Sequence, residues 1–150
     1  MLIYDQLKRD HEKLKSMMNR LEATTGRAVK TRMELLQELK TLLLAHTKAE
    51  EAVFYRTILS DDSTCDQALE SLDEHKSAEA ALAEIEDTDP KSDAWLQRFK
   101  FFKRSLEHHF EEEEKDLFKK ARKIVSRDEA EELGDIFQEL RIEVIEDLGT

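Results

Sequence analysis

The chain has 150 residues, the length of one domain with a single core, and its composition is that of a helical protein. Only three glycines and one proline occur, so residues that interrupt helices are scarce and strands are not expected. The formal net charge of -11 opposes binding to nucleic-acid phosphates and to anionic membranes. The single cysteine, Cys65, excludes an intramolecular disulfide and a multi-cysteine zinc site.

The sequence also bears on localisation. No apolar run approaches the roughly 20 residues that a membrane span requires. Asp5 and Asp10 interrupt the region where a secretory signal would be continuously apolar. We therefore expect a cytoplasmic protein that has neither membrane nor nucleic-acid partners.

Hydrophobic periodicity predicts five helical segments joined by short turns. The predicted ranges are 3–23, 27–59, 63–86, 90–124 and 127–148. Pro90 is expected in the first turn of the fourth helix, and Ser126 with Glu129 forms a capping-box pattern before the last. Four long helices with short joints predict an all-α, antiparallel up-down-up-down four-helix bundle within a single domain, 1–150. The bundle is expected to occupy about 3–125, with an additional C-terminal helix at about 127–148.

Histidines and glutamates interrupt the apolar stripes of the four predicted bundle helices. They are His11, His46, Glu50, His75, His109 and Glu113. A step of four residues returns to nearly the same helix face, so each His-x3-Glu pair shares a face. A buried carboxylate is costly without a counter-charge, and no Arg or Lys interrupts these stripes. Because imidazoles with carboxylates form a metal-ligand set, we interpret these residues as candidates for metal binding.

Two segments, 46–55 and 109–118, share the pattern His-x3-Glu-Glu-x2-apolar-aromatic. Together with the segment that ends at His11 and with the lone His75, they resemble the hemerythrin-like (HHE cation-binding) domain family, over about residues 3–118. Family members commonly have proline after each aromatic residue. Here Arg56 and Lys119 stand at those positions, which should let the helices continue.

The resemblance implies a non-haem di-iron centre. Two iron ions would be bound by the four histidines (His11, His46, His75 and His109) and bridged by the carboxylates of Glu50 and Glu113. Oxygen-carrying members have a further histidine four residues after the first one in the third helix. Glu79 stands there, which makes it a further candidate ligand and argues against reversible oxygen carriage.

Several neighbouring residues are expected to have lesser roles. On a helix, His108 points about 100° away from His109, so it should lie behind the ligands or in solvent. Glu51 and Glu114 could reach the edge of the site but are expected outside it. Tyr55 could donate a hydrogen bond near the metal but is expected mainly to pack.

The functions that the resemblance implies are binding, sensing or detoxification of oxygen, peroxide or nitric oxide, or iron storage. Because family members include carriers, sensors and redox-active proteins, the resemblance leaves open whether the chain is an enzyme, and no catalytic residue is assigned. The alternative is a helical protein–protein interaction module with a structural or vestigial metal site. In that case a homodimer through the C-terminal helix is one expected assembly.

Overall fold

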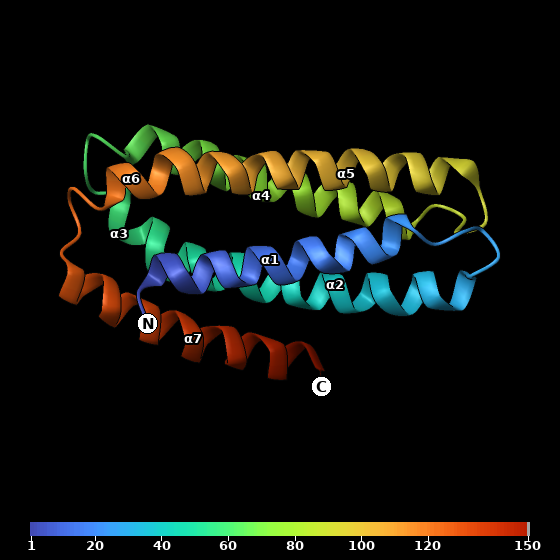
Figure 1. The fold of residues 1–150 in the computed structure, drawn as a ribbon, viewed down its shortest axis with the longest axis horizontal. Helices are drawn as coiled ribbons and strands as arrows, with labels where there is room; N and C mark the ends of the chain where they lie inside the picture. Colours follow the sequence, from blue (N-terminus) through green and yellow to red (C-terminus); the bar gives the residue numbers. More distant parts are fainter. Residues whose placement is uncertain (150) are drawn as a thin grey trace.

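Four long helices run side by side along the long axis of the molecule in the computed structural model, which describes residues 1–149 (Figure 1). They are α1 (Ile3–Glu22), α2 (Val29–Glu50), α4 (Cys65–Glu86) and α5 (Asp93–Glu112). Successive helices run in opposite directions, and residues 1–149 contain no strand. The predicted all-α, antiparallel four-helix bundle is therefore confirmed.

A fifth long helix, α7 (Arg127–Gly149), lies outside the bundle and packs against α1 and α2. Gly134 permits the close approach, because a Cβ at this position would lie 2.1 Å from the carbonyl oxygen of Met1. Ser126 Oγ accepts a hydrogen bond from the backbone N–H of Glu129 at 3.1 Å, as expected for a helix N-cap. The additional C-terminal helix is thus present and is fixed closely against the start of α1.

Two π-helical turns interrupt the bundle helices, at η1 (Glu51–Tyr55) and η2 (Glu113–Leu117). Short α-helical turns, α3 (Arg56–Ile58) and α6 (Phe118–Ala121), continue the chain beyond them. In an α-helix, a residue five positions on lies about 140° around the axis. The wider π turn bonds groups five residues apart and returns that residue toward the starting face. Tyr55 is therefore brought toward the face of α2 that carries Glu50.

One predicted boundary is wrong. Pro90 does not lie in the first turn of the fourth helix, because α5 begins at Asp93. The N-cap is Ser92, whose side chain accepts a hydrogen bond from the backbone N–H of Trp95. Pro90 instead lies in the preceding turn.

Two hydrophobic clusters fill the bundle, one rich in Leu and Phe around Trp95 and the other around Phe54 and Phe118. The polar residues of the apolar stripes lie between them along the helices. On α1, for example, His11 follows Leu7 of one cluster and precedes Leu14 of the other. No helix within residues 1–149 combines the length and apolar character that a membrane crossing requires.

Candidate metal centre

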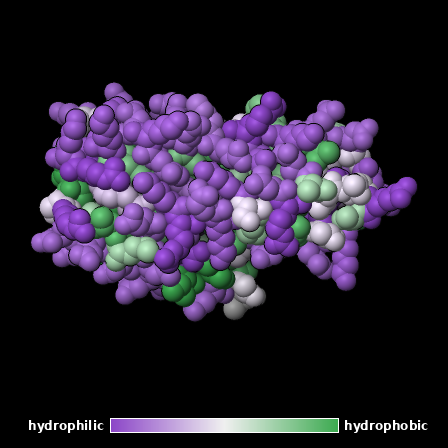
Figure 2. Space-filling view, viewed as in Figure 1, coloured by the Kyte–Doolittle hydropathy of each residue, from purple (hydrophilic) through white to green (hydrophobic). Residues whose placement is uncertain are grey.

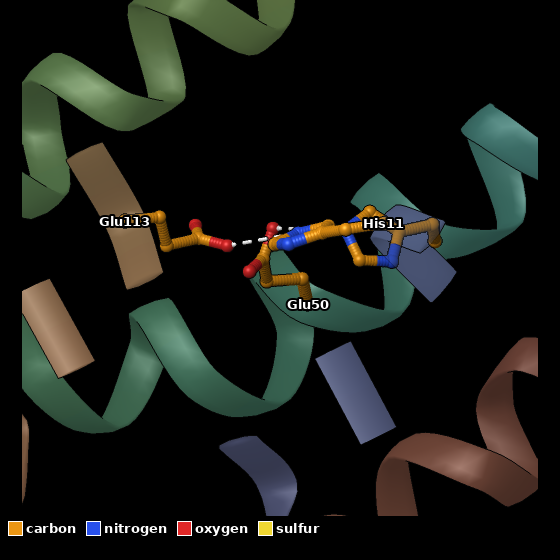
Figure 3. Close-up of side chains that lie close together, drawn as sticks. His11, Glu50 and Glu113 are labelled. Atoms are coloured by element: carbon orange, nitrogen blue, oxygen red, sulfur yellow. Dashed lines mark ion pairs between the residues drawn. The ribbon is translucent and has the colours of Figure 1, made fainter. Parts of the chain in front are cut away.

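Six polar side chains meet inside the bundle. They are His11 from α1, His46 and Glu50 from α2, His75 from α4, His109 from α5 and Glu113 from the start of η2. None is more than 3% exposed. Figure 3 shows the Glu113 carboxylate pointing toward the His11 ring, with Glu50 beside them. The structure therefore brings together all six residues that interrupt the apolar stripes, which we call the inner residues.

The two glutamates lie between pairs of histidines. Glu50 Oε1 lies 3.6 Å from His46 Nε2 and 3.3 Å from His75 Nε2. Glu113 Oε1 lies 3.2 Å from His11 Nε2, and its Oε2 lies 3.7 Å from His109 Nε2. Each carboxylate thus faces imidazoles from both halves of the chain.

These contacts define two four-residue groups that share both glutamates. The first consists of His11, His46, Glu50 and Glu113, and the second of Glu50, His75, His109 and Glu113. Within each group the candidate ligand atoms lie within 4.8 Å of one another. Two imidazoles and two carboxylates per group form a donor set suited to a transition-metal ion.

The hydrogen bonding of the inner residues also fits metal ions. His11 Nε2, His46 Nε2, both carboxylate oxygens of Glu50 and Oε1 of Glu113 are buried without a hydrogen-bond partner. Unpaired buried polar atoms are costly and uncommon in folded proteins. Their convergence on one space fits a cation there, because a metal ion would satisfy these lone pairs together.

A second set of carboxylates surrounds the inner residues, and each one binds the Nδ1 atom of one histidine. Glu114 lies 2.7 Å from His11, Asp10 2.9 Å from His46, Glu51 2.8 Å from His75 and Glu74 2.8 Å from His109. We call these four residues the outer carboxylates. By accepting a hydrogen bond at Nδ1, each one holds its ring with the Nε2 lone pair turned inward, as metal-binding histidines require.

The outer carboxylates form a closed ring around the bundle. The α1 helix supplies Asp10 to α2, and η1 supplies Glu51 to α4. The α4 helix supplies Glu74, which binds a histidine of α5. Glu114, from η2, binds the histidine of α1 and closes the ring. Each helix therefore orients a histidine of the next helix.

In the metal-free protein, burial and neighbouring charges shift the pKa values of the inner residues. Burial opposes the charged form of His11, but the carboxylates of Glu113 and Glu114 outweigh it and raise the His11 pKa to about 9. Burial lowers the pKa of His46 to about 4, despite its bond to Asp10. Burial and the neighbouring Glu113 carboxylate raise the pKa of Glu50 well above its usual value. Both shifts favour the protonated forms of Glu50 and His11 when no cation is bound.

Tyr55 enters the site through the η1 turn. Its hydroxyl donates a short hydrogen bond to Glu113 Oε2 and lies 3.4 Å from His75 Nε2. Burial and the Glu113 and Glu50 carboxylates raise the pKa of the Tyr55 phenol well above 10.0. Of the two roles expected for Tyr55, the hydrogen bond near the candidate ligands is the one found, and the preferred packing role is wrong. The α-helical period does not anticipate the π turn that places this hydroxyl.

Other sequence-based expectations have mixed outcomes. Glu79 is exposed on α4 and belongs to neither four-residue group. His108 is exposed and lies 3.1 Å from Glu112. Of the two positions expected for it, behind the ligands or in solvent, it occupies the one in solvent. Glu51 and Glu114 do not lie outside the site, since both bind histidines.

Asp10 and Glu74 are site residues that the sequence interpretation missed. A signal for them exists, since each immediately precedes an inner histidine, as Glu51 and Glu114 immediately follow an inner glutamate. An acidic residue next to a ligand is turned about 100° from it, toward the adjacent helix.

Comparisons with known proteins bear on the family and the fold of the chain. The family model of the hemerythrin HHE cation-binding domain matches residues 2–121. A solved structure, a hemerythrin HHE cation-binding domain-containing protein from Mycobacterium kansasii, is similar in fold with a TM-score of 0.87. It is 21% identical, and the match covers 98% of this chain and 89% of that one. No curated protein matches the sequence. Because the family model matches well over half of the chain, the chain belongs to the hemerythrin HHE cation-binding domain family.

Proposed function

We propose that the protein binds two iron ions and uses them to bind, sense or detoxify oxygen, peroxide or nitric oxide. The observation that carries this proposal is the pair of four-residue groups that share Glu50 and Glu113. In the proposed centre, His11 and His46 would hold one ion and His75 and His109 would hold the other. Glu50 and Glu113 would serve both ions.

The donor types support iron. A set of six buried imidazoles and carboxylates exceeds what one tetrahedral zinc ion needs, and imidazole with carboxylate suits non-haem iron. Each four-residue group would supply two imidazoles and two carboxylates, which would leave coordination sites for a small ligand. Iron held in this way supplies redox and Lewis-acid chemistry toward oxygen, peroxide and nitric oxide. Storage of iron at the same residues is the other function that we propose for this site.

The surrounding residues prepare the site for small molecules. The outer carboxylates fix the four imidazoles, and the Tyr55 hydroxyl places a proton donor beside Glu113. A cavity of about 360 Å³ lies between α4 and α5 and reaches His109 and Glu74. Its lining combines apolar side chains such as Ala78 and Leu106 with the acidic side chains of Glu70 and Asp73, which disfavours anionic molecules approaching from this side.

Metal analysis of protein purified from iron-supplemented medium tests the proposal. We expect two irons per chain and a near-ultraviolet charge-transfer band that responds to azide or peroxide. Glu50→Ala and Glu113→Ala should each lose at least one iron, because each carboxylate serves both positions. Glu79→Ala is the matched control and should keep both, since Glu79 is exposed. Two irons in both single mutants would show that the bridging assignment is wrong.

A second candidate function is a helical interaction module with a structural or vestigial metal site. Three large hydrophobic residues that are exposed on α7 favour it, namely Ile136, Ile142 and Leu148. Figure 2 shows hydrophobic side chains gathered along the lower edge of a largely hydrophilic face, where Figure 1 places α7. Folded, colourless, metal-free protein that sediments as a dimer would support this function and the homodimer through α7.

A further inference from the structure

The two halves of the bundle contribute to the site in the same way. Asp10 precedes His11 as Glu74 precedes His75, and the two His-x3-Glu-Glu segments follow. Each half supplies both histidines of one four-residue group and one shared glutamate. By ligand type alone, the two metal positions of the proposed centre would be equivalent.

The α7 helix breaks this equivalence. Arg141 Nε donates a hydrogen bond of 2.9 Å to Asp10 Oδ2, the same oxygen that lies 2.9 Å from His46 Nδ1. Asp10 and Arg141 have side chains only 8% and 14% exposed, so solvent screens this ion pair weakly. Glu74, the counterpart of Asp10, forms no ion pair with Lys or Arg within residues 1–149. One outer carboxylate of the matched pair is therefore neutralised and the other is not.

We propose that Arg141 is a positioning residue that acts through Asp10 and makes the two iron positions electronically different. This inference rests on the proposed two-iron function. A carboxylate that accepts the Nδ1 proton makes an imidazole a stronger donor to a metal. A guanidinium on the same carboxylate oxygen weakens this effect, so His46 donates less to its iron than His109 does. The iron held by His11 and His46 is thus the more easily reduced of the two.

The position of Arg141 in the chain makes this a property of α7. The family model matches residues 2–121, and α7 begins at Arg127. Phe137, one turn earlier on the same helix, places its ring 5.9 Å from the His46 ring at 80°. The α7 helix therefore contacts the same histidine both through a hydrogen-bonded ion pair and through an aromatic ring.

An electronic role for Arg141 and a purely structural one predict different signs for the shifts in reduction potential of two variants. Replacing Asp10 by Asn removes a negative charge beside His46 and should raise the reduction potential of the nearer iron. Arg141→Gln removes a positive charge at the same place and should lower it. A role limited to packing would shift the potential in the same direction in both variants, because both substitutions break the same contact.

Spectroelectrochemical titration of the iron-loaded full chain, followed at the charge-transfer band, measures these shifts. We expect opposite shifts of the first reduction step in Asp10→Asn and Arg141→Gln, and a value near wild type in Arg141→Lys, which keeps the charge. Arg127→Gln is the matched control, since it removes the same charge from the exposed start of α7. A chelator titration should also show one iron of Asp10→Asn bound roughly 10 to 100 times more weakly.

The outcomes separate this inference from the proposed function. Wild-type protein that does not bind two irons would refute the function on which the inference rests. Wild-type protein with two irons, combined with equal-sign shifts or no shifts in the two variants, would refute the role of Arg141 alone. A shift in Arg127→Gln as large as in Arg141→Gln would also refute it, because the effect would then come from net charge.

Discussion

Removing the metal should leave a protein that loses stability as the pH rises from about 6.5 to about 9. The cause is His11, whose pKa is raised from 6.5 to about 9 in the folded, metal-free chain. A group whose pKa is higher in the folded than in the unfolded chain stabilises the fold. This stabilisation is complete when the pH lies below the unfolded-state pKa, and it is lost as the pH rises through the folded-state pKa. The shift corresponds to about 3 kcal/mol of unfolding free energy between these limits.

Glu50 acts in the same direction. Its pKa is also raised in the fold, so its buried proton stabilises the metal-free chain and is lost as the pH rises. Metal binding has the opposite pH dependence, because the ligands must release their protons before they bind the metal. Metal affinity should therefore rise by up to about tenfold per pH unit for each proton released, until the pH passes about 9.

Urea unfolding of the chelator-treated and iron-loaded protein, at a series of pH values between 6 and 9.5 or so, measures both trends. The gap in stability between the two forms should widen with pH. His11→Gln should remove much of the decline in the metal-free form, whereas His108→Gln should keep it, since that histidine is exposed. Equal stability of the metal-free wild type at the two ends of the range would refute the reasoning.

Three further predictions concern the docking of α7, the Tyr55 hydroxyl and the end of the bundle around Arg32. Gly134→Ala should cost about 1 to 3 kcal/mol of unfolding free energy in urea, because its Cβ would meet backbone atoms of the N-terminus. Gly149→Ala, with nothing within 4 Å, should leave the midpoint unchanged. Tyr55→Phe should weaken iron binding about tenfold in a chelator competition, because a shared carboxylate loses its donor; unaltered affinity would contradict this. Arg32→Met should cost about 2 to 3 kcal/mol in thermal or urea unfolding, because two backbone carbonyls lose their buried partner; a loss below about 0.5 kcal/mol would argue against that role.

Helical periodicity accounts for most of what could be predicted. The step of four residues from His46 to Glu50, and from His109 to Glu113, places each pair on one face whatever the neighbouring helices do. The fold follows from the same stripes, because each must be buried against the others. Ligation by the six inner residues stays a proposal, although the structure brings them together.

The partners of the inner residues depend on information that periodicity does not contain. Asp10 lies beside His11 in sequence but binds His46, because the pairing is set by how neighbouring helices are rotated. Tyr55 reaches the site only because η1 is a π turn, which no count of 3.6 residues predicts. Arg141 is 131 residues away from Asp10, so only the docking of α7 reveals their contact.

The division of the ligands between the two halves bears on how such a centre can originate. One helical hairpin with an internal π turn carries two imidazoles, one shared carboxylate and two outer carboxylates. Two identical hairpins meeting about a two-fold axis would bring together the complete donor set and close the ring of outer carboxylates. Duplication and fusion of a half-length gene is therefore a sufficient route to this chain. In such a lineage α7, which lies outside the repeat, would be one part that distinguishes the two ancestral positions.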